Sequence, residues 1–582
     1  MKSVKTVSLC ICILSVTARF FVKETQAYYF FDQKPIIASK SKQQQHHEQQ
    51  HATEEWNYDY YNDDDFSKAD PFDNDNPLKT RQQIRKDLGT LPDSYLLTPR
   101  EKQKYIQDAF VFSWEGYKNY SWGYDENRPV SNGPRNTRNG WGATIVDALD
   151  TLYIMGMHHE FRAAQRFVAR IDWDRLISND EPVQLFETVI RYVGGLLSAY
   201  ELSHENVFIT KAVELVERLL PAFDTPTGIP YQYVDFTTGE PVKNEVVCLA
   251  EIGTIQIEFT RLSQITGNWK YHNIGQRVYD TFVNKDIRRF GLFPHLINVK
   301  SGEPVGNHIT WGGMGDSFYE YLIKQLVIAK GKDPAKWQMV SEVISSLENY
   351  LLVDSPSDRH ASFLALLESD EQVLQMDELA CFAPGTLLLL ARTFPREYGN
   401  IETIATRLMN GCYSAWDLTA TGLAPEVFSW AQPDPDIGDS DTDGNDRKKP
   451  AVYPIHPSYI LRPETIESLY YFYVYTHDPI YQDMAWDIFS SMYTYCKAKS
   501  GYSGVTRVDV PTKTWDDREE SFFFAETLKY LYLIFDDPKH PRFPFDKWVF
   551  NTEAHPLRME SNLVPTTESS NTRNAWKLYQ QQ

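Results

Sequence analysis

Turns rich in glycine, proline and polar residues interrupt this 582-residue chain at similar intervals, for example TGNWK near residue 268, KGKDP near 333 and THDPIY near 478. Between the turns, apolar residues follow a helical period, and Val193, Leu197 and Tyr200 fall on one face of the segment 187–202. Turns roughly 50 to 80 residues apart leave room for two helices and their connections, so the repeated unit is a helical hairpin. Strand-like alternation is scarce, and we predict an all-α fold.

Acidic residues decide how the hairpins are arranged. About 450 residues at roughly 65 per hairpin make about seven hairpins, which could form an open solenoid or a closed α/α barrel. Carboxylates are rarely buried among aromatic residues unless they are paired, metal-bound or catalytic. One acid lies near the start of the first helix of successive hairpins, and these acids are Glu187, Glu251, Asp316, Glu378, Glu464 and Glu526. Parallel first helices would bring them to one rim, so we predict a closed barrel with an acid-lined pocket.

Composition excludes one class of partner. The net charge of -21 argues against nucleic acid, which needs a basic surface. Aromatic residues make up 14% of the chain, which suits a large core as well as walls that stack on sugars.

The N-terminal segment predicts entry into the secretory pathway. Two lysines precede an apolar run from Val7 to Ala18 and a small-residue stop at Ala27, which is typical of a signal peptide or a short signal anchor. The next segment is rich in Gln, His and Asp and cannot bury enough apolar surface to fold. We predict a signal peptide or short anchor over 1–27, a flexible Gln/Asp-rich stem over 28–95, a barrel domain over 96–556 and a C-terminal tail over 557–582.

Cysteines and a glycosylation sequon fit an oxidising compartment. Cys248, Cys381, Cys412 and Cys496 allow three full pairings, and the residues alone do not choose among them. Asn119-Tyr120-Ser121 is a possible glycan site at Asn119.

Two motifs suggest metal sites but lack the surroundings that such sites require. His47 to His51 matches the zinc motif HExxH but lies in the Gln-rich stem, where nothing would pack a helix or exclude water. Asp439 to Gly444 resembles the start of an EF-hand loop, yet Pro450 takes the position of the bidentate glutamate. We interpret both as solvated surface sequence.

A pocket with several carboxylates and aromatic walls suits hydrolysis of a glycosidic bond. One carboxylic acid protonates the leaving oxygen, and a second carboxylate activates water or attacks directly. A helix N-terminus favours the charged form of a carboxylate. The acid must therefore be kept protonated by acidic neighbours or desolvation, or must pass its proton through a water. The alternative is that these acids only cap helices and pair with Arg191 and Arg462.

Five long segments make the chain similar to a known family. They are FETVIRYVGGLLSAYELS, GDSFYEYLIK, LRPETIESLYYFY, ESFFFAETLKYLYLIF and DKWVFNTEAHPL. They resemble the signature segments of the class I α-1,2-mannosidases, glycoside hydrolase family 47, in family order over about residues 100 to 556. The resemblance implies an (αα)7 barrel, a bound Ca²⁺ ion and inverting removal of α-1,2-linked mannose from high-mannose N-glycans.

The resemblance also implies roles for individual residues. Glu187 resembles the general acid, acting through a water, Glu464 the general base, and Asp316 a third acid whose role is hard to assign. Thr552 of FNTEAH resembles the one direct protein ligand to calcium, whose water-rich shell would admit a sugar diol. The positions similar to those that hold sugar hydroxyls or calcium waters are Arg191, Glu251, Arg462, Glu467, Phe522, Glu526 and Glu553, with Phe522 stacking on mannose.

The family's disulfide matches Cys381 and Cys412, which leaves Cys248 and Cys496 as expected free thiols.

Glu378 departs from the family pattern, and Met314 bears on which members of the family the chain resembles more. Glu378 of MDELACF stands where the family usually has a histidine, so it either adds charge to the acidic rim or turns outward. Met314 stands where endoplasmic-reticulum members that trim one preferred branch carry an arginine. A methionine cannot form the hydrogen bonds of an arginine fork, so we expect broader, Golgi-like trimming.

Three functions remain to be distinguished. The first is a calcium-dependent mannosidase of the Golgi or endoplasmic-reticulum lumen, or secreted, which we expect to be monomeric and to meet a membrane only if its leader stays uncleaved. The second is an inactive mannose-glycan-binding relative in glycoprotein quality control, and the third is a helical scaffold without a site. The presence of Glu187, Asp316, Glu464 and Thr552 together favours the enzyme.

Overall fold

The computed structural model describes residues 90–176, 181–284, 288–430 and 452–559, which belong to one compact unit, Gln83–Gln582. The predicted leader, nearly all of the stem, the His47 to His51 motif, the Asp439 loop and nearly all of the tail lie outside these residues. Within the described ranges, no helix has both the length and the apolar character needed to cross a membrane.

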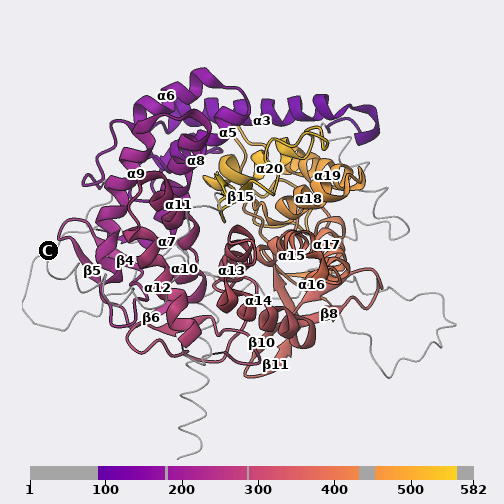
Figure 1. Cartoon of the computed structure of the whole chain (residues 1–582). Coiled ribbons are helices and arrows are strands. Elements are labelled where there is room, and N and C mark those ends of the chain that lie inside the picture. The colour runs from indigo at the N-terminus through magenta and orange to yellow at the C-terminus, as the bar shows by residue number, and fades with distance from the viewer. Residues whose placement is uncertain (1–89, 177–180, 285–287, 431–451, 560–582) are drawn as a thin grey trace, which may run out of the picture. The chain divides into compact units, whose positions relative to one another are not determined.

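Two layers of helices alternate along the described chain (Figure 1). The outer layer consists of α3 (Pro99–Tyr120), α6 (His158–Val168), α9 (Asn206–Leu219), α12 (Lys270–Asn284), α14 (Pro334–Ser346), α17 (Ile401–Asp417) and α19 (Ile480–Tyr495). The inner layer consists of α4 (Ala143–Asp147) with α5 (Leu149–Ile154), α7 (Leu185–Glu187) with η2 (Thr188–Val193) and α8 (Gly194–Ser203), α10 (Leu249–Gly253) with α11 (Gln256–Thr266), α13 (Asp316–Ile328), η5 (Glu378–Phe382) with α15 (Ala383–Thr393), α18 (Glu464–Thr476), and η6 (Phe523–Thr527) with α20 (Leu528–Leu533). Shorter helical turns are η1 (Ser94–Leu96), η3 (Leu220–Phe223), η4 (Leu347–Leu351) and α16 (Pro395–Tyr398).

The inner helices close into a ring. In order around it, α5 packs on α8, α8 on α11, α10 on α13, α13 on α15, α15 on α18 and α18 on α20, and η6 returns to α5. Outer helices cover this ring, with α12 on α11, α17 on α15 and α3 on α20. The described residues thus contain seven inner and seven outer helical segments. The predicted all-α (αα)7 barrel with minor β elements is confirmed.

Local sequence explains where the helices begin and end. Thr98 caps α3, because its hydroxyl accepts from the backbone of Glu101 while the Glu101 carboxylate accepts from Thr98. Gly267 and His477, in two of the predicted turns, end α11 and α18 in the left-handed conformation.

Short antiparallel strand pairs lie between the helices. Three strands lead without a break into inner helices: β3 into α7, β6 into α10 and β12 into η5. In each case an acid lies in the first three residues of the helix that follows the strand, and these acids are Glu187, Glu251 and Glu378. The strands are β1 (Glu126–Arg128), β2 (Gly133–Arg135), β3 (Val183–Gln184), β4 (Tyr233–Asp235), β5 (Glu240–Val242), β6 (Val246–Cys248), β7 (Leu296–Asn298), β8 (Leu352–Asp354), β9 (Ser362–Leu364), β10 (Leu366–Glu368), β11 (Glu371–Val373), β12 (Gln375–Asp377), β13 (Val427–Trp430), β14 (Val452–His456), β15 (Trp548–Phe550) and β16 (Pro556–Arg558).

One strand pair, β15 with β16, reaches the centre of the ring. Its residues contact six inner segments: α5, η2, α11, α13, α18 and α20. Such contacts on all sides place this hairpin near the barrel axis, and we call residues 548–558 the axial hairpin. Strand β16 crosses the boundary predicted at residue 556 and continues to Arg558.

The cysteines are arranged as the resemblance implied. Cys381 of η5 is bonded to Cys412 of α17, which ties an inner segment to an outer helix. Cys248 and Cys496 are buried free thiols.

Candidate active site

The six acids that were singled out in the sequence all lie at the beginning of inner segments. Glu187 ends the single turn of α7, while Asp316, Glu378 and Glu464 are the first residues of their helices. The remaining two, Glu251 and Glu526, lie in the first turns of α10 and η6.

Electrostatic interactions tie these acids to one centre. Burial is the largest cause that raises the pKa of Asp316, Glu467 and Glu526, and the charge of Glu464 contributes to each of the three shifts. These residues belong to α13, α18 and η6, so acids from three inner segments interact with the charge of Glu464.

Two of the predicted residues lie on π-helical turns. Arg191 belongs to η2 and Glu526 to η6, the only two inner segments of the described chain that have this wider turn. Such turns are rare and are frequently found at functional sites, since the added residue changes the direction of the side chains around it. Nothing in the hydrophobic period of the sequence indicated them.

Arg191 organises one side of the site. Its guanidinium donates to Glu187 at 2.6 Å and to Glu553, and it lies 3.6 Å from Asp147. Arg138 forms a second ion pair with Glu187 at 3.3 Å. Burial would raise the pKa of Glu187, but the two arginines outweigh it and lower the pKa to about 2. Glu187 is therefore ionised at neutral pH, as the start of a helix also favours.

Arg462 is the second arginine of the predicted site, and it pairs with a different set of acids. It donates to Glu426 at 2.6 Å and lies 4.0 Å from the carboxylate of Glu464. Glu426 also accepts from the backbone N–H of Ile460, which fixes the loop that leads into α18. Glu426 was not predicted, because nothing in its local sequence distinguishes it from a surface acid.

The axial hairpin presents Thr552 to the site. The backbone N–H of Thr552 donates to the Tyr321 hydroxyl at 3.3 Å, and the side chain is half-buried. Neither its hydroxyl nor its carbonyl oxygen has a hydrogen-bond partner among the described residues. The hairpin can approach the helices closely because Gly194 has no Cβ, and an added Cβ would lie 2.5 Å from the Asn551 amide.

Glu258 supports this turn and was not among the predicted site residues. Its carboxylate accepts from Tyr321 at 2.5 Å and from Asn551 at 2.9 Å, and burial raises its pKa to about 7. The sequence signal that could have found it is its position, seven residues after Glu251 on the next inner helix.

A buried ionic cluster anchors the same hairpin from behind. Lys529 of α20 contacts both oxygens of Asp150, at 2.9 and 3.0 Å, and donates to the Ala554 carbonyl at 2.7 Å. His555 contacts Asp150 at 2.8 Å, and these ionisable side chains are fully buried. Sequence patterns missed this cluster because its members come from α5, α20 and the hairpin.

The remaining predicted residues have specific surroundings. Glu251 accepts from the amides of Gln184 and Gln232, while burial raises its pKa to about 7. Phe522 is buried with its ring 5.7 Å from the Arg191 guanidinium, so it packs on the site as well as on the core. Asn119 is exposed near the end of α3.

The structure shows the surroundings of Glu519, Met314 and Glu378. Glu519 is structural, because its carboxylate accepts from the backbone of Tyr502 and from Asn127. Met314 adopts a left-handed φ of 73°, and its carbonyl accepts from Ala250 and Cys248. Glu378 points inward: it is buried and accepts from Thr465, so the outward alternative is wrong.

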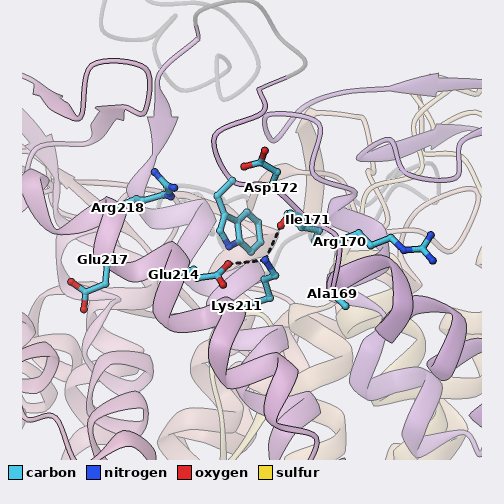
Figure 2. A pocket seen from close by; sticks show the side chains of 9 residues that line it. Ala169, Arg170, Ile171, Asp172, Lys211, Glu214, Glu217 and Arg218 are labelled. Atoms are coloured by element: carbon cyan, nitrogen blue, oxygen red, sulfur yellow. Dashed lines mark hydrogen bonds and ion pairs between the residues drawn. The ribbon is translucent and has the colours of Figure 1, made fainter.

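A surface pocket of about 470 Å³ lies elsewhere, between residues 169–173 and α9 (Figure 2). Its charged side chains are engaged with near neighbours: Lys211 donates to Glu214 and to the Ile171 carbonyl. None of the predicted site residues lines it.

Asp316 yields a prediction about stability. Burial raises its pKa to about 8, with Asp377 and Glu464 contributing. An acid whose pKa is higher in the folded state destabilises the fold progressively as pH rises from the unfolded pKa near 3.9 to the folded value. We expect Asp316→Asn to increase the free energy of unfolding more at pH 8 than at pH 5, by about 2 kcal/mol for this partly exposed carboxyl. Urea unfolding at both pH values measures this, and an equal effect at the two would contradict it.

The closed α/α barrel and its central carboxylates define the class of α/α-barrel glycoside hydrolases. The sequence profile of glycosyl hydrolase family 47 matches residues 109–559. The chain is 38% identical to mannosyl-oligosaccharide 1,2-alpha-mannosidase IB of Homo sapiens over 81% of its own length and 72% of that protein. It is 38% identical to mannosyl-oligosaccharide 1,2-alpha-mannosidase MNS1 of Arabidopsis thaliana over 84% of its own length and 82% of that protein.

A solved structure gives the same result. The alpha-1,2-mannosidase from Trichoderma reesei superposes with a TM-score of 0.74 at 31% identity, over 79% of this chain and 99% of that one. The chain belongs to glycosyl hydrolase family 47.

Proposed function

We propose that this protein removes α-1,2-linked mannose from high-mannose N-glycans in the secretory pathway, with inversion at the anomeric carbon and with calcium. Two observations support the proposal: Arg191 pairs with both Glu187 and Glu553, the neighbour of Thr552, and the charge of Glu464 contributes to the raised pKa of Asp316. The family relationship supplies the expected linkage and sugar.

Each carboxyl group has a role that follows from whether it is protonated at neutral pH. Glu464 acts as the general base, which takes a proton from the attacking water. Glu187 is ionised beside its arginines, so it acts through a water that passes a proton to the leaving oxygen. Asp316, with its pKa near 8, keeps a proton at neutral pH and so offers a hydrogen-bond donor to the substrate. Inversion requires acid and base to be roughly 6.5 to 9.5 Å apart, so that water fits between base and sugar.

The residues around Thr552 suit a calcium ion held mainly by waters. The hydroxyl and carbonyl oxygens of Thr552 are hard ligands without a protein partner in the described chain. Burial raises the pKa of Glu526, and the neighbouring charges of Glu553, Glu464 and Glu467 add to the shift, so the carboxylates here exceed the available cations. In the described chain no three His, Cys, Asp or Glu side chains have the spacing to bind a metal directly. Calcium would supply a cation that accepts sugar hydroxyls and neutralises part of this charge.

Side chains around the acids would hold the substrate. Phe522 offers an aromatic face next to Arg191, and Arg462, Glu251 and Glu467 offer hydrogen-bonding groups for hydroxyls. Met314 lacks the donors with which an arginine would select one branch, so several α-1,2-linked mannoses are substrates.

The direct test is release of mannose from a nine-mannose N-glycan with calcium and with a chelator. We expect release that stops with the chelator and returns when calcium is added, and an NMR spectrum in which β-mannose appears first. Binding of the glycan without release in calcium would instead indicate the inactive glycan-binding relative. Neither binding nor release would indicate a scaffold.

A further inference from the structure

Glu378 is held firmly beside Glu464. Its side-chain Oε1 accepts from the backbone N–H of Thr465 at 3.2 Å and from the Thr465 hydroxyl at 2.8 Å. Its own backbone N–H donates to the Glu426 carbonyl at 3.0 Å. Since Thr465 follows Glu464 directly, these bonds join the start of η5 to the start of α18.

One oxygen of each carboxyl group lacks a hydrogen-bond donor in the described chain, and a single proton between the two groups would satisfy both. Glu378 Oε2 and Glu464 Oε2 are both buried, and neither receives a hydrogen bond from a protein donor in the described chain. Because Glu378 Oε1 is bonded to Thr465, the residue after Glu464, the two carboxyl groups are neighbours, and the charge of Glu464 adds to the raised pKa of Glu378. Two ionised oxygens in contact repel, whereas one carboxylic acid donates to the other carboxylate.

The groups around the pair do not supply an alternative charge. Arg462 is the cation nearest to it, and this guanidinium already pairs with Glu426 at 2.6 Å and lies 4.0 Å from Glu464. The other facing groups include Thr465 and the buried phenol of Tyr459, whose hydroxyl donates to the Arg462 carbonyl. Five further acids also interact with the charge of Glu464, namely Asp316, Asp377, Glu426, Glu467 and Glu526, and they add negative charge around the pair. Burial, followed by the charge of Glu464, raises the pKa of Glu378 well above its usual value.

We propose that Glu378 is protonated and donates a hydrogen bond to Glu464 Oε2, and so acts as a positioning residue for the general base. The inference rests on the proposed role of Glu464. It also accounts for the exchange of the family's usual histidine for glutamate, because a neutral carboxylic acid, like an imidazole N–H, provides one hydrogen-bond donor. The bond fixes the orientation of the Glu464 carboxylate toward the attacking water.

Two substitutions of Glu378 with side chains of similar size test whether this residue acts as a hydrogen-bond donor or only fills space. Glu378→Met removes the donor, and we expect kcat for mannose release to fall roughly tenfold or more, as loss of a hydrogen bond to a charged group predicts, with KM changing less. Glu378→Gln retains an N–H donor and is expected to restore kcat to within about fivefold of the original protein. We expect kcat of the original protein to decline at alkaline pH as Glu378 and Asp316 ionise. Since an amide does not titrate, the Gln variant should lose the part of this decline that comes from Glu378 and keep the part that comes from Asp316.

Thr465→Val is the matched control, since it removes a hydrogen bond to Glu378 Oε1 without removing the carboxyl pair. It should lower thermal stability and leave the alkaline decline in place. Equal kcat for the Met and Gln variants, or an unchanged alkaline decline in Gln, would overturn the role of Glu378. Absence of mannose release by the original protein would instead refute the proposed function itself.

Discussion

Substitution of Glu464 by glutamine is expected to lower kcat for mannose release by about 10³-fold, the typical contribution of a positioned general base. Glutamine has the same shape, but it cannot take a proton from the attacking water. The change also removes one negative charge from a centre where the Glu464 charge contributes to the raised pKa of Asp316, Glu467 and Glu526. The variant should therefore be at least as stable as the original protein.

Single-turnover release of mannose, measured together with thermal unfolding, tests both parts of this prediction. Glu402→Gln is a suitable control, because Glu402 pairs with Arg392 on the exposed side of α17, and neither activity nor folding should change appreciably. Residual kcat within about tenfold of the original protein, in a folded Glu464→Gln variant, would exclude Glu464 as the base.

Substitution of Lys529 by methionine is expected to cost about 3 to 5 kcal/mol of unfolding free energy. The ammonium group is fully buried and contacts both oxygens of Asp150 as well as the Ala554 carbonyl. Its loss would leave Asp150 with His555 as its remaining cationic partner and would loosen the turn that presents Thr552. We therefore expect this variant to need more calcium for half-maximal activity.

Denaturant unfolding of the single variants Lys529→Met and Asp150→Asn and of the double variant measures the coupling. The double variant should be less destabilised than the sum of the singles, because removal of both charges leaves none unpaired. Lys300→Met is the control, since Lys300 and its partner Glu245 are both exposed and its loss should change stability little. A loss below about 1 kcal/mol for Lys529→Met would show that the cluster does not anchor the hairpin.

The pH dependence of stability gives a second measure of the same cluster. Burial opposes ionisation of Asp150, but Lys529 and His555 outweigh it and lower the pKa to about 2. A carboxylate with a lowered pKa stabilises the fold above its unfolded pKa near 3.9, and this contribution is lost as pH falls toward 2. The Lys529→Met variant should show a weaker loss over this interval.

Sequence periodicity predicted the architecture well because helical hairpins are local structures. The turns at TGNWK and THDPIY end helices at Gly267 and His477, as composition alone indicated. The acids at the helix starts were equally visible, since each lies within its own helical segment. Sequence could not reveal that Arg191 and Glu526 lie on π-helical turns, which leave the hydrophobic pattern nearly unchanged.

The sequence by itself determined the number of helical pairs, the acid at the start of six of the seven inner segments in the described chain and, through its resemblance, the family and the Cys381–Cys412 bond. Only the tertiary structure decided which charged side chains contact one another. It bonded Glu378 to Thr465 beside Glu464, placed two arginines on Glu187 and brought the axial hairpin to the centre of the ring. Protonation depends on burial and on neighbours within a few ångströms, and partners as distant in the chain as Asp150 and Lys529 become neighbours only when the barrel closes.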